Sequence, residues 1–267
     1  MKADFAVRYG PWAVIAGASE GIGAAFAHAL ASRGISLVLV ARREEPLAQL
    51  AGTLPVPSRT VVADLASGGT HKVFQESQDL DVGLVIANAA LSPIGPFTTV
   101  EPSLLRRALE LNCGAALDLA RHYTPAMVAR GRGGLILMSS MAGQQGSPGI
   151  AVYAATKAFD AVLAEGLWAE LRPHGVDVLA CIPGAVETPG LARNSSGRAP
   201  GTVTADVVAA AALKALGRKP RVVPGTMMRL SAMFMTHLIP KRTAINIIAR
   251  ASSDVLRVQS NARADRP

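Results

Sequence analysis

The stretch Trp12-Ala-Val-Ile-Ala-Gly17-Ala-Ser-Glu-Gly21-Ile-Gly23 joins an apolar run to an Ala-rich segment through three glycines. Glycines allow a tight turn and a close approach of the backbone to a pyrophosphate, and a helix that begins there offers free N–H groups to the phosphates. The spacing is G-x-x-x-G-x-G and not the general G-x-G-x-x-G. The main evidence for a dinucleotide site is therefore the position of the glycines between a predicted strand and a predicted helix. The stretch therefore predicts a strand-turn-helix unit that binds a dinucleotide through Gly17, Ser19, Gly21, Ile22 and Gly23.

Apolar runs and Ala-rich segments continue to alternate along the chain. We predict strands at Trp12–Ala16, Ser36–Val40, Thr60–Ala63, Gly83–Ala87, Gly134–Met138, Asp177–Ile182 and Arg221–Pro224, and helices at Gly21–Ser32, Glu44–Ala51, Pro102–Ala129 and Tyr153–Arg172. Continuous apolar runs are typical of strands that are covered on both faces. The β-α alternation predicts an α/β Rossmann fold, a doubly wound parallel sheet of about seven strands with helices on both faces. We expect one domain over residues 1–267, with its ligand at the carboxyl ends of the strands.

The composition favours a folded protein without a catalytic metal. Of the 267 residues, 50% are hydrophobic and 17% are charged, which supplies a sizeable core. We find no signal peptide and no apolar run of the roughly 18 residues that a membrane span needs. Cys113 and Cys181 lie far apart in apolar segments and are interpreted as buried thiols, and the histidines form no cluster with metal-ligand spacing. We expect a cytoplasmic protein with no metal.

The basic charge is concentrated in the last part of the chain. The net charge is +8, and the segment from Lys214 onward has eleven Lys and Arg residues against two Asp, so it carries 11 − 2 = +9 and the remainder about −1. This distribution, without interleaved aromatic residues, argues against nucleic acid as a partner. The basic, amphipathic extension at about residues 225–267 is expected to pack on the core, a substrate pocket or a partner subunit. Peripheral contact with an anionic membrane is the less favoured alternative.

The end of the second predicted strand indicates which dinucleotide is bound. An NAD site usually has an acidic residue about 20 residues after the glycines, whereas this chain has Arg42, followed by Arg43. A guanidinium pairs with a 2′-phosphate through its forked donors, and a carboxylate would repel that phosphate. The sequence therefore predicts NADP(H) rather than NAD(H), with Arg42 as the phosphate ligand and Arg43 as the alternative.

Later strand ends and one polar segment add to the same site. Asp64 and Leu65 follow the third predicted strand, where a carboxylate could accept a hydrogen bond from the adenine amino group. Asn88 follows the fourth, near the middle of the sheet. The Gly-, Pro- and Ser-rich segment at about residues 189–202 follows the sixth strand, and we expect it to be a loop that covers the substrate. An ordinary surface loop is the alternative.

A tyrosine and a lysine four residues apart form a candidate reaction centre. Tyr153 and Lys157 would lie one turn apart on the same helical face. A tyrosine ordinarily titrates near pH 10, and a neighbouring ammonium favours the phenolate, which can then exchange a proton with an alcohol or a ketone. Ser140 ends the preceding strand, 13 residues before Tyr153, and could hold the substrate oxygen; Ser139 is the alternative hydroxyl.

With these residues the chain resembles the short-chain dehydrogenase/reductase family from about Trp12 to Thr188. The resemblance rests on the glycine turn, Asp64, Asn88, Asn112, Ser140, Tyr153, Lys157 and the stretch Pro183-Gly184-Ala-Val186-Glu-Thr188. It implies that Tyr153 is the general acid/base, that Ser140 orients the substrate, and that Lys157 also binds the nicotinamide ribose. It further implies that Asn112 holds a water joining Lys157 to a proton relay, and that Val186 and Thr188 hold the carboxamide, beside Pro183 and Gly184.

The chain also departs from the pattern of the family. Ala16 stands where a threonine usually precedes the first glycine, Ala90 stands where a glycine usually ends the stretch after the fourth strand, and Glu20 replaces the basic residue that some NADP-binding members carry. Only Arg42 and Arg43 are then left for the 2′-phosphate.

The resemblance suggests a secondary alcohol or ketone as substrate. The beginning of the chain, Tyr9-Gly10-Pro-Trp12, is similar to that of bacterial hydroxysteroid dehydrogenases of the family, so a steroid or other hydrophobic cyclic ketone is the first candidate. The alternatives are a carrier- or CoA-bound 3-ketoacyl group and a non-catalytic NADP(H)-binding sensor. Since the helices Pro102–Ala129 and Tyr153–Arg172 correspond to the surfaces through which the family associates, we expect a homodimer or homotetramer.

Overall fold

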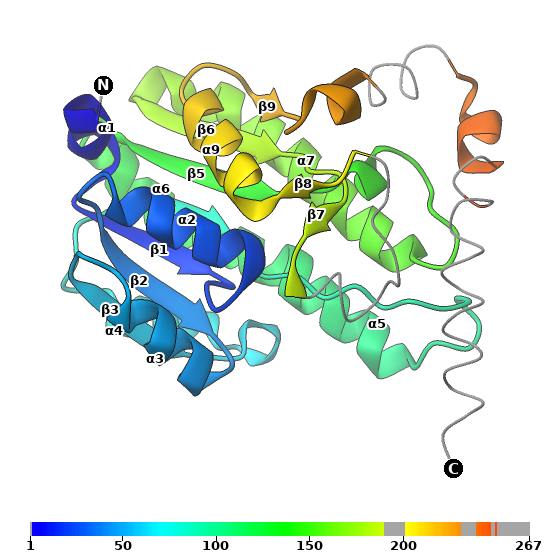
Figure 1. The fold of residues 1–267 in the computed structure, drawn as a ribbon, viewed down its shortest axis with the longest axis horizontal. Coiled ribbons are helices and arrows are strands. Elements are labelled where there is room, and N and C mark those ends of the chain that lie inside the picture. The colour runs from blue at the N-terminus through cyan, green and yellow to red at the C-terminus, as the bar shows by residue number, and fades with distance from the viewer. Residues whose placement is uncertain (1, 190–200, 231–238, 247–248, 250–267) are drawn as a thin grey trace.

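The main sheet has seven parallel strands in the order β3-β2-β1-β4-β5-β6-β9 (Figure 1). Its strands are β1 (Trp12–Ala16), β2 (Ser36–Ala41), β3 (Ser58–Val62), β4 (Val82–Ala87), β5 (Gly133–Met138), β6 (Val176–Cys181) and β9 (Arg221–Val222). A separate pair, β7 (Val186–Glu187) and β8 (Val203–Thr204), lies beyond β6. The computed structural model describes residues 2–189, 201–230, 239–246 and 249. The predicted doubly wound α/β fold is confirmed.

Helices cover both faces of the sheet. They are α1 (Lys2–Tyr9), α2 (Gly21–Ala31), α3 (Glu44–Gly52), α4 (Thr70–Glu76), α5 (Pro102–Leu109), α6 (Ala115–Ala129), α7 (Ala151–Leu171) and α9 (Ala205–Ala215), with a π-helical turn η2 (Glu110–Gly114) and 3₁₀ turns η1 (Leu65–Ser67), η3 (Met141–Gln144) and η4 (Arg172–His174). One face is covered by α2 and α9 and the other by α6 and α7. Within the part of the chain that the structure describes, no helix is long and apolar enough to cross a bilayer.

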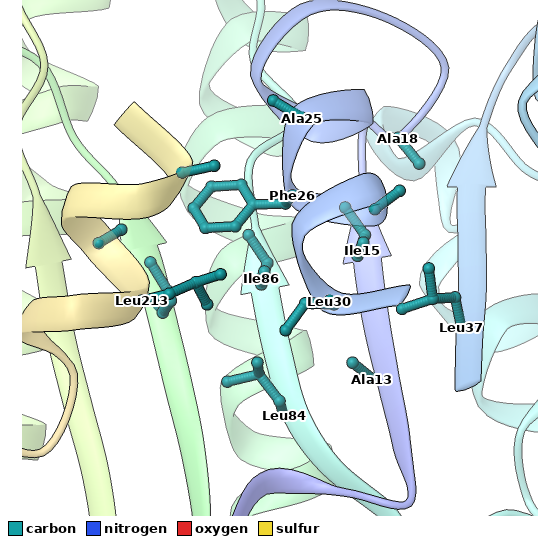
Figure 2. Packing of buried hydrophobic residues seen from close by; sticks show 14 of the residues in the cluster. Ala13, Ile15, Ala18, Ala25, Phe26, Leu30, Leu37, Leu84, Ile86 and Leu213 are labelled. Carbon is teal, nitrogen blue, oxygen red and sulfur yellow. The ribbon is translucent and has the colours of Figure 1, made fainter. Parts of the chain in front are cut away.

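Alternate residues of each strand feed two separate hydrophobic cores. Phe26 of α2 packs with Ile15 and Ile86 of the sheet and with Leu213 of α9 in the first core (Figure 2). The neighbouring strand residue, Val14, belongs to the second core beneath α6 and α7. Because full burial of one such side chain contributes roughly 1.5–3 kcal/mol, these two cores hold the strand ends, and the side chains that follow them, in fixed positions.

The predicted helix over Pro102–Ala129 is present without a break, but its middle turn is π-helical. The structure divides this segment into α5, η2 and α6, and the π-helical turn contains Asn112. Such single turns inside α-helices are frequent at functional sites, because the extra residue re-aims the side chains of that turn. The other predicted elements are present with bounds that differ by at most two residues, whereas α1, α4 and α9 were not predicted.

Candidate active site

A cavity of about 340 Å³ lies at the carboxyl ends of the central strands. Nine of the residues predicted to bind a dinucleotide line it: Gly17, Ser19, Gly21, Ile22, Arg42, Arg43, Leu65, Asn88 and Thr188. Further lining residues that the prediction did not include are Glu20, Val40, Ala41, Ala63, Ala89, Ala90 and Leu111. Most of these residues are next in sequence to predicted residues at strand ends. Their position in the chain, and not their side-chain chemistry, could have identified them as lining residues.

The glycine turn is shaped by close backbone packing. Gly17 has φ +77°, and a Cβ placed on it would lie 2.8 Å from the Cα of Ala89. Gly23 does not line the cavity, but a Cβ there would collide with the Gly17 carbonyl, so it allows the helix to pack on the strand. The Asn88 side chain fixes the turn by donating a hydrogen bond of 2.9 Å from Nδ2 to the Gly17 oxygen.

The first N–H groups of α2 face this turn without a side-chain cap. Glu20 is the N-cap residue, yet its carboxylate makes no capping hydrogen bond. Its Oε2 instead accepts from Nη2 of Arg43 at 2.7 Å. A helix N-terminus that keeps its N–H groups for a ligand is a suitable anion site, so the turn fits a pyrophosphate.

Asp64 lies beside this cavity without lining it. Its Oδ2 accepts from Nη2 of Arg107 at 2.5 Å and its Oδ1 from the Ala66 N–H at 3.1 Å. Burial opposes ionisation of this carboxyl, but Arg107, the Ala66 N–H and the charge of Arg42 together lower its pKa below the usual range. Asp64 is thus an ionised acceptor at the end of β3, and its contact with adenine stays a prediction.

The two adjacent serines differ in burial and in hydrogen bonding. The buried Ser139 Oγ donates to the backbone oxygen of Lys157 at 2.6 Å. The half-buried Ser140 Oγ accepts from the Ala142 N–H at 3.2 Å and donates to no acceptor among the described residues. Gly143 of η3 lies directly against the Lys157 backbone, where a Cβ would lie 2.6 Å from the carbonyl carbon, so η3 holds Ser140 next to α7.

Lys157 is buried next to Tyr153. Its Nζ lies 5.9 Å from the centroid of the Tyr153 ring. The ammonium donates to the Met138 oxygen at 2.7 Å and to Oδ2 of Asp160 at 2.9 Å. The sequence prediction missed Asp160, although a carboxylate three residues after Lys157 in a largely apolar helix was a visible signal.

The Asn112 side chain ties three segments together. Its Nδ2 donates to the Leu91 oxygen and to Oγ1 of Thr156, both at 2.9 Å, and its Oδ1 accepts from the Leu91 N–H at 2.8 Å. Both amide protons are therefore used to join η2 to α7 and to the loop after β4. The contact of Asn112 with a relay water stays a prediction. Because both side-chain amide protons are used, backbone groups of the π-helical turn would have to bind that water.

The stretch after β6 returns to the glycine turn. A Cβ on Gly21, which has φ +59°, would lie 2.9 Å from Cγ2 of Thr188, and Val186 is buried in the first core. The backbone oxygen of Pro183 accepts from the Met141 N–H at 2.9 Å, which joins this stretch to η3. Gly184 lies against the Met228 side chain. Of the predicted substrate loop, residues 190–200 lie outside the described residues, as do 231–238, 247–248 and 250–267 of the basic extension.

Neither cysteine is placed for thiolate chemistry. Burial is the main reason that the pKa of the Cys113 thiol rises to about 11, and burial also raises the pKa of Cys181. Cys113 is partly exposed, which differs from the prediction, because η2 is only partly covered. Over the described ranges, no three His, Cys, Asp or Glu side chains come together in a way that could hold a metal.

Comparison with known proteins agrees with this geometry. The sequence profile of the short chain dehydrogenase family matches residues 11–199. This chain belongs to the short-chain dehydrogenase family. The 7beta-hydroxysteroid dehydrogenase of Collinsella aerofaciens is 33% identical over 229 residues, which cover 82% of this chain and 87% of that protein. A protein of this family is an oxidoreductase that acts on an alcohol or a ketone and uses NAD(P)(H).

Solved structures of the family have the same fold. One from work on the stereoselectivity of a 7beta-hydroxysteroid dehydrogenase superposes with a TM-score of 0.86 at 30% identity, covering 91% of this chain and 98% of that one. A short-chain dehydrogenase from Sphingobium yanoikuyae in complex with NADPH has a TM-score of 0.74 at 31% identity, covering 84% of this chain and 92% of that one. The glycine turn and the uncapped start of α2 fit such a dinucleotide, since side chains at Gly17 or Gly21 would fill the turn.

Proposed function

We propose that this short-chain dehydrogenase interconverts a bulky hydrophobic secondary alcohol and its ketone with NADP(H). The observation that carries the cofactor preference is the pair Arg42 and Arg43 on the wall of the cavity. The carboxylate of Glu20 also lines this wall, but it is paired with Arg43. Two guanidinium groups at the end of β2 favour a 2′-phosphate over a free hydroxyl.

The proton chemistry falls to Tyr153, Ser140 and Lys157. A bound nicotinamide supplies the hydride acceptor or donor. The Tyr153 phenol gives its proton to the ketone oxygen in reduction, and the phenolate takes it from the alcohol in oxidation. The Ser140 hydroxyl donates a hydrogen bond to the same substrate oxygen, and the positive charge of Lys157 stabilises the phenolate.

Apolar side chains lie in the segments that adjoin this centre in the chain or through the Asn112 hydrogen bonds. Leu91 and Ile94 are half-buried in the loop after β4, where Phe97 is 66% exposed, and Met141 follows Ser140 directly. The Gly95 N–H donates to the Gly149 oxygen at 2.8 Å, so the loop after β4 meets the loop before α7. An exposed aromatic ring in this loop is expected to gain stability by contact with a large apolar substrate. The relatives named as 7beta-hydroxysteroid dehydrogenases support a steroid as that substrate.

In the basic extension, residues 239–246 lie near the loop before α7. Ala244 is only 2% exposed, and Ile245 Cδ1 lies 3.8 Å from the position of a Cβ on Gly146. Lys241 and Arg242 are exposed. We infer that the apolar side of this segment packs on the rim of the substrate site, and that its basic residues face solvent. This packing favours a substrate-binding role over a membrane anchor.

Exposed apolar side chains on α6 and α7 support self-association. Leu117 is 48% exposed, and Phe159 and Val162 on α7 are 37% and 70% exposed. A helix face of this kind gains stability when a second copy covers it. We therefore propose a homodimer or homotetramer, which light scattering after size-exclusion chromatography would test; a monomer at micromolar concentration would contradict it.

The activity is tested with purified protein, NADPH and NADH in parallel, and a panel of ketosteroids and smaller hydrophobic ketones. The expected result is oxidation of NADPH with a bulky ketone. Tyr153→Phe should abolish turnover while NADPH binding, followed by fluorescence, is retained. Binding of both cofactors without turnover of any ketone would overturn the reductase and support the non-catalytic sensor instead.

A further inference from the structure

Asp160 places a buried carboxylate behind the lysine of the reaction centre. It lies on α7 three residues after Lys157, and both side chains are 3% exposed. Oδ2 of Asp160 is 2.9 Å from Nζ of Lys157, and Oδ1 finds no hydrogen-bond partner within the described part of the chain. A buried carboxylate is costly unless it is paired, so the charge of Asp160 depends on this one ammonium.

The carboxylate also determines how the ammonium is oriented. Lys157 has three N–H donors, of which one goes to the Met138 oxygen at 2.7 Å and one to Asp160. The third donor has no partner among the described residues, and the centroid of the Tyr153 ring lies 5.9 Å from Nζ. Asp160 therefore fixes the direction of the remaining N–H bond, and its negative charge offsets part of the positive field that Lys157 exerts on the phenol.

Few other charged groups act on this cluster. Within the described residues, η2 contributes the Cys113 thiol and the exposed Glu110. On the sheet side, β5 contributes the uncharged Met138 carbonyl, and the β6 residues beneath α7 are apolar. In α5, Arg107 is paired with Asp64 and Arg106 is exposed. Lys157 is the positive charge that Asp160 contacts directly.

Burial raises the pKa of the Asp160 carboxyl, and the ammonium of Lys157 opposes this rise. The pairing at 2.9 Å supports the ionised form. Only the ionised form of Asp160 carries a charge that can act on the Tyr153 phenol through Lys157. A protonated Asp160 would have no such effect.

We propose that Asp160 is a positioning residue that orients Lys157 and, through it, sets the pH at which Tyr153 gains and loses its proton. This rests on the proposed roles of Tyr153 and Lys157 in the reaction. A neutral residue at position 160 would leave the field of the ammonium unopposed, so the phenolate would form at lower pH. The carboxylate thereby favours the protonated phenol, which is the form that reduction of a ketone needs.

The protein offers a direct measurement that needs no turnover. It has only three tyrosines, and the other two, Tyr9 and Tyr123, are buried with pKa values raised by that burial. A pH titration of tyrosinate absorbance on the cofactor-free protein, compared with Tyr153→Phe, therefore isolates the step of Tyr153. In Asp160→Asn this step should move to lower pH by about one unit, the size expected of a charge several ångströms from a partly buried phenol. An unchanged midpoint would overturn the proposal.

Charge and structure are separated by further variants. Asp160→Glu keeps the charge and should keep the midpoint near that of the wild type. If Asp160→Asn does not fold, the smaller neutral variant Asp160→Ser takes its place. Failure of both neutral variants to fold, with Asp160→Glu folded, would assign the carboxylate to stability alone and overturn the proposal.

The pH profile of kcat/KM for alcohol oxidation gives an independent readout. Its acid limb should shift in Asp160→Asn by the same amount and in the same direction as the absorbance step. The matched control is Asp177→Asn, another buried carboxylate, which pairs with Arg8 and Tyr9 at the opposite end of the sheet; it should lower stability and leave the limb in place. No turnover by the wild-type protein would contradict the proposed function, whereas turnover with an unmoved limb would contradict only the role of Asp160.

Discussion

Oε2 of Glu20 lies 2.7 Å from Nη2 of Arg43, and both residues line the cofactor cavity. A guanidinium that already holds a carboxylate has fewer donors to offer a phosphate, and the carboxylate itself repels that phosphate. Arg42 is not part of this ion pair. On the cavity wall, Arg43 is thus paired with Glu20 and Arg42 is not. Substitution of the two arginines should therefore have different effects on the affinity for NADPH.

Arg42→Ala is expected to raise KM for NADPH about 10- to 100-fold, the loss that corresponds to one charge-assisted hydrogen-bonding group. KM for NADH should change little, because its ribose carries a hydroxyl where NADPH has a phosphate. Steady-state kcat/KM with each cofactor measures the difference, and Arg42→Lys, which keeps the charge but not the fork, should lie in between. An equal loss with both cofactors would mean that Arg42 supports the turn and does not read the phosphate.

Glu20→Gln should strengthen NADPH binding. Removal of the carboxylate releases Arg43 and ends the repulsion of the phosphate, for which we expect a gain of about three- to tenfold from an exposed pair of this kind. Fluorescence titration with NADPH and NADH gives both affinities. The matched control is Glu45→Gln in the first turn of α3, which does not line the cavity and accepts a hydrogen bond from Gln49. A weaker NADPH affinity in Glu20→Gln would show that the ion pair holds Arg43 in its binding position.

Alanine substitutions at Gly17 and Gly34 distinguish two causes of lost stability. One is the left-handed backbone conformation, and the other is a steric clash of the added Cβ. Both glycines have φ +77°, but a Cβ on Gly17 would lie 2.8 Å from the Ala89 Cα, whereas one on Gly34 meets nothing within 4 Å. Gly34→Ala should cost about 1 kcal/mol of unfolding free energy through the left-handed conformation alone. Gly17→Ala should cost at least about 2 kcal/mol more and should also weaken NADPH binding, because the turn must shift. Urea unfolding compares the two, and equal losses would show that the turn yields without cost.

Much of the fold followed from local patterns because strands buried on both faces leave a strong signal. The run Ser36-Leu-Val-Leu-Val-Ala41 forms β2 almost as predicted, since a continuous apolar run bounded by polar residues has few alternatives in an α/β sheet. The first helix of the chain, α1, gave no such signal. It is held by contacts distant in sequence: Arg8 and Tyr9 both donate to Asp177, at 2.6 and 2.7 Å.

The same limit applies to the site. The residues at strand ends came together because the topology fixes where each strand ends. The partners of those residues could not be predicted, since Asp64 meets Arg107 and Asn112 meets Thr156 only after the helices pack. The π-helical turn at Asn112 has the same origin, because a helical pattern does not show where one additional residue is accommodated.

The contact between Tyr9 and Asp177 predicts loss of stability at alkaline pH. Burial first, and then the neighbouring carboxylate, raise the pKa of Tyr9 well above its ordinary value of about 10. Below that pH the phenol is protonated in both the folded and the unfolded chain, and the stability is complete. Above it the unfolded chain releases a proton that the folded protein keeps, so the free energy of unfolding falls by up to about 1.4 kcal/mol per pH unit for this tyrosine.

Tyr9→Phe should remove this dependence. The variant is expected to lose about 1 kcal/mol at neutral pH, because the hydrogen bond to Asp177 is gone, while Arg8 still pairs with that carboxylate. Between about pH 10 and 11 its stability should fall less steeply than that of the wild type, leaving the contribution of Tyr123, whose pKa burial also raises. Urea unfolding at a series of pH values measures both slopes. Parallel curves for the two proteins would mean that Tyr9 ionises as readily in the folded protein as in the unfolded chain.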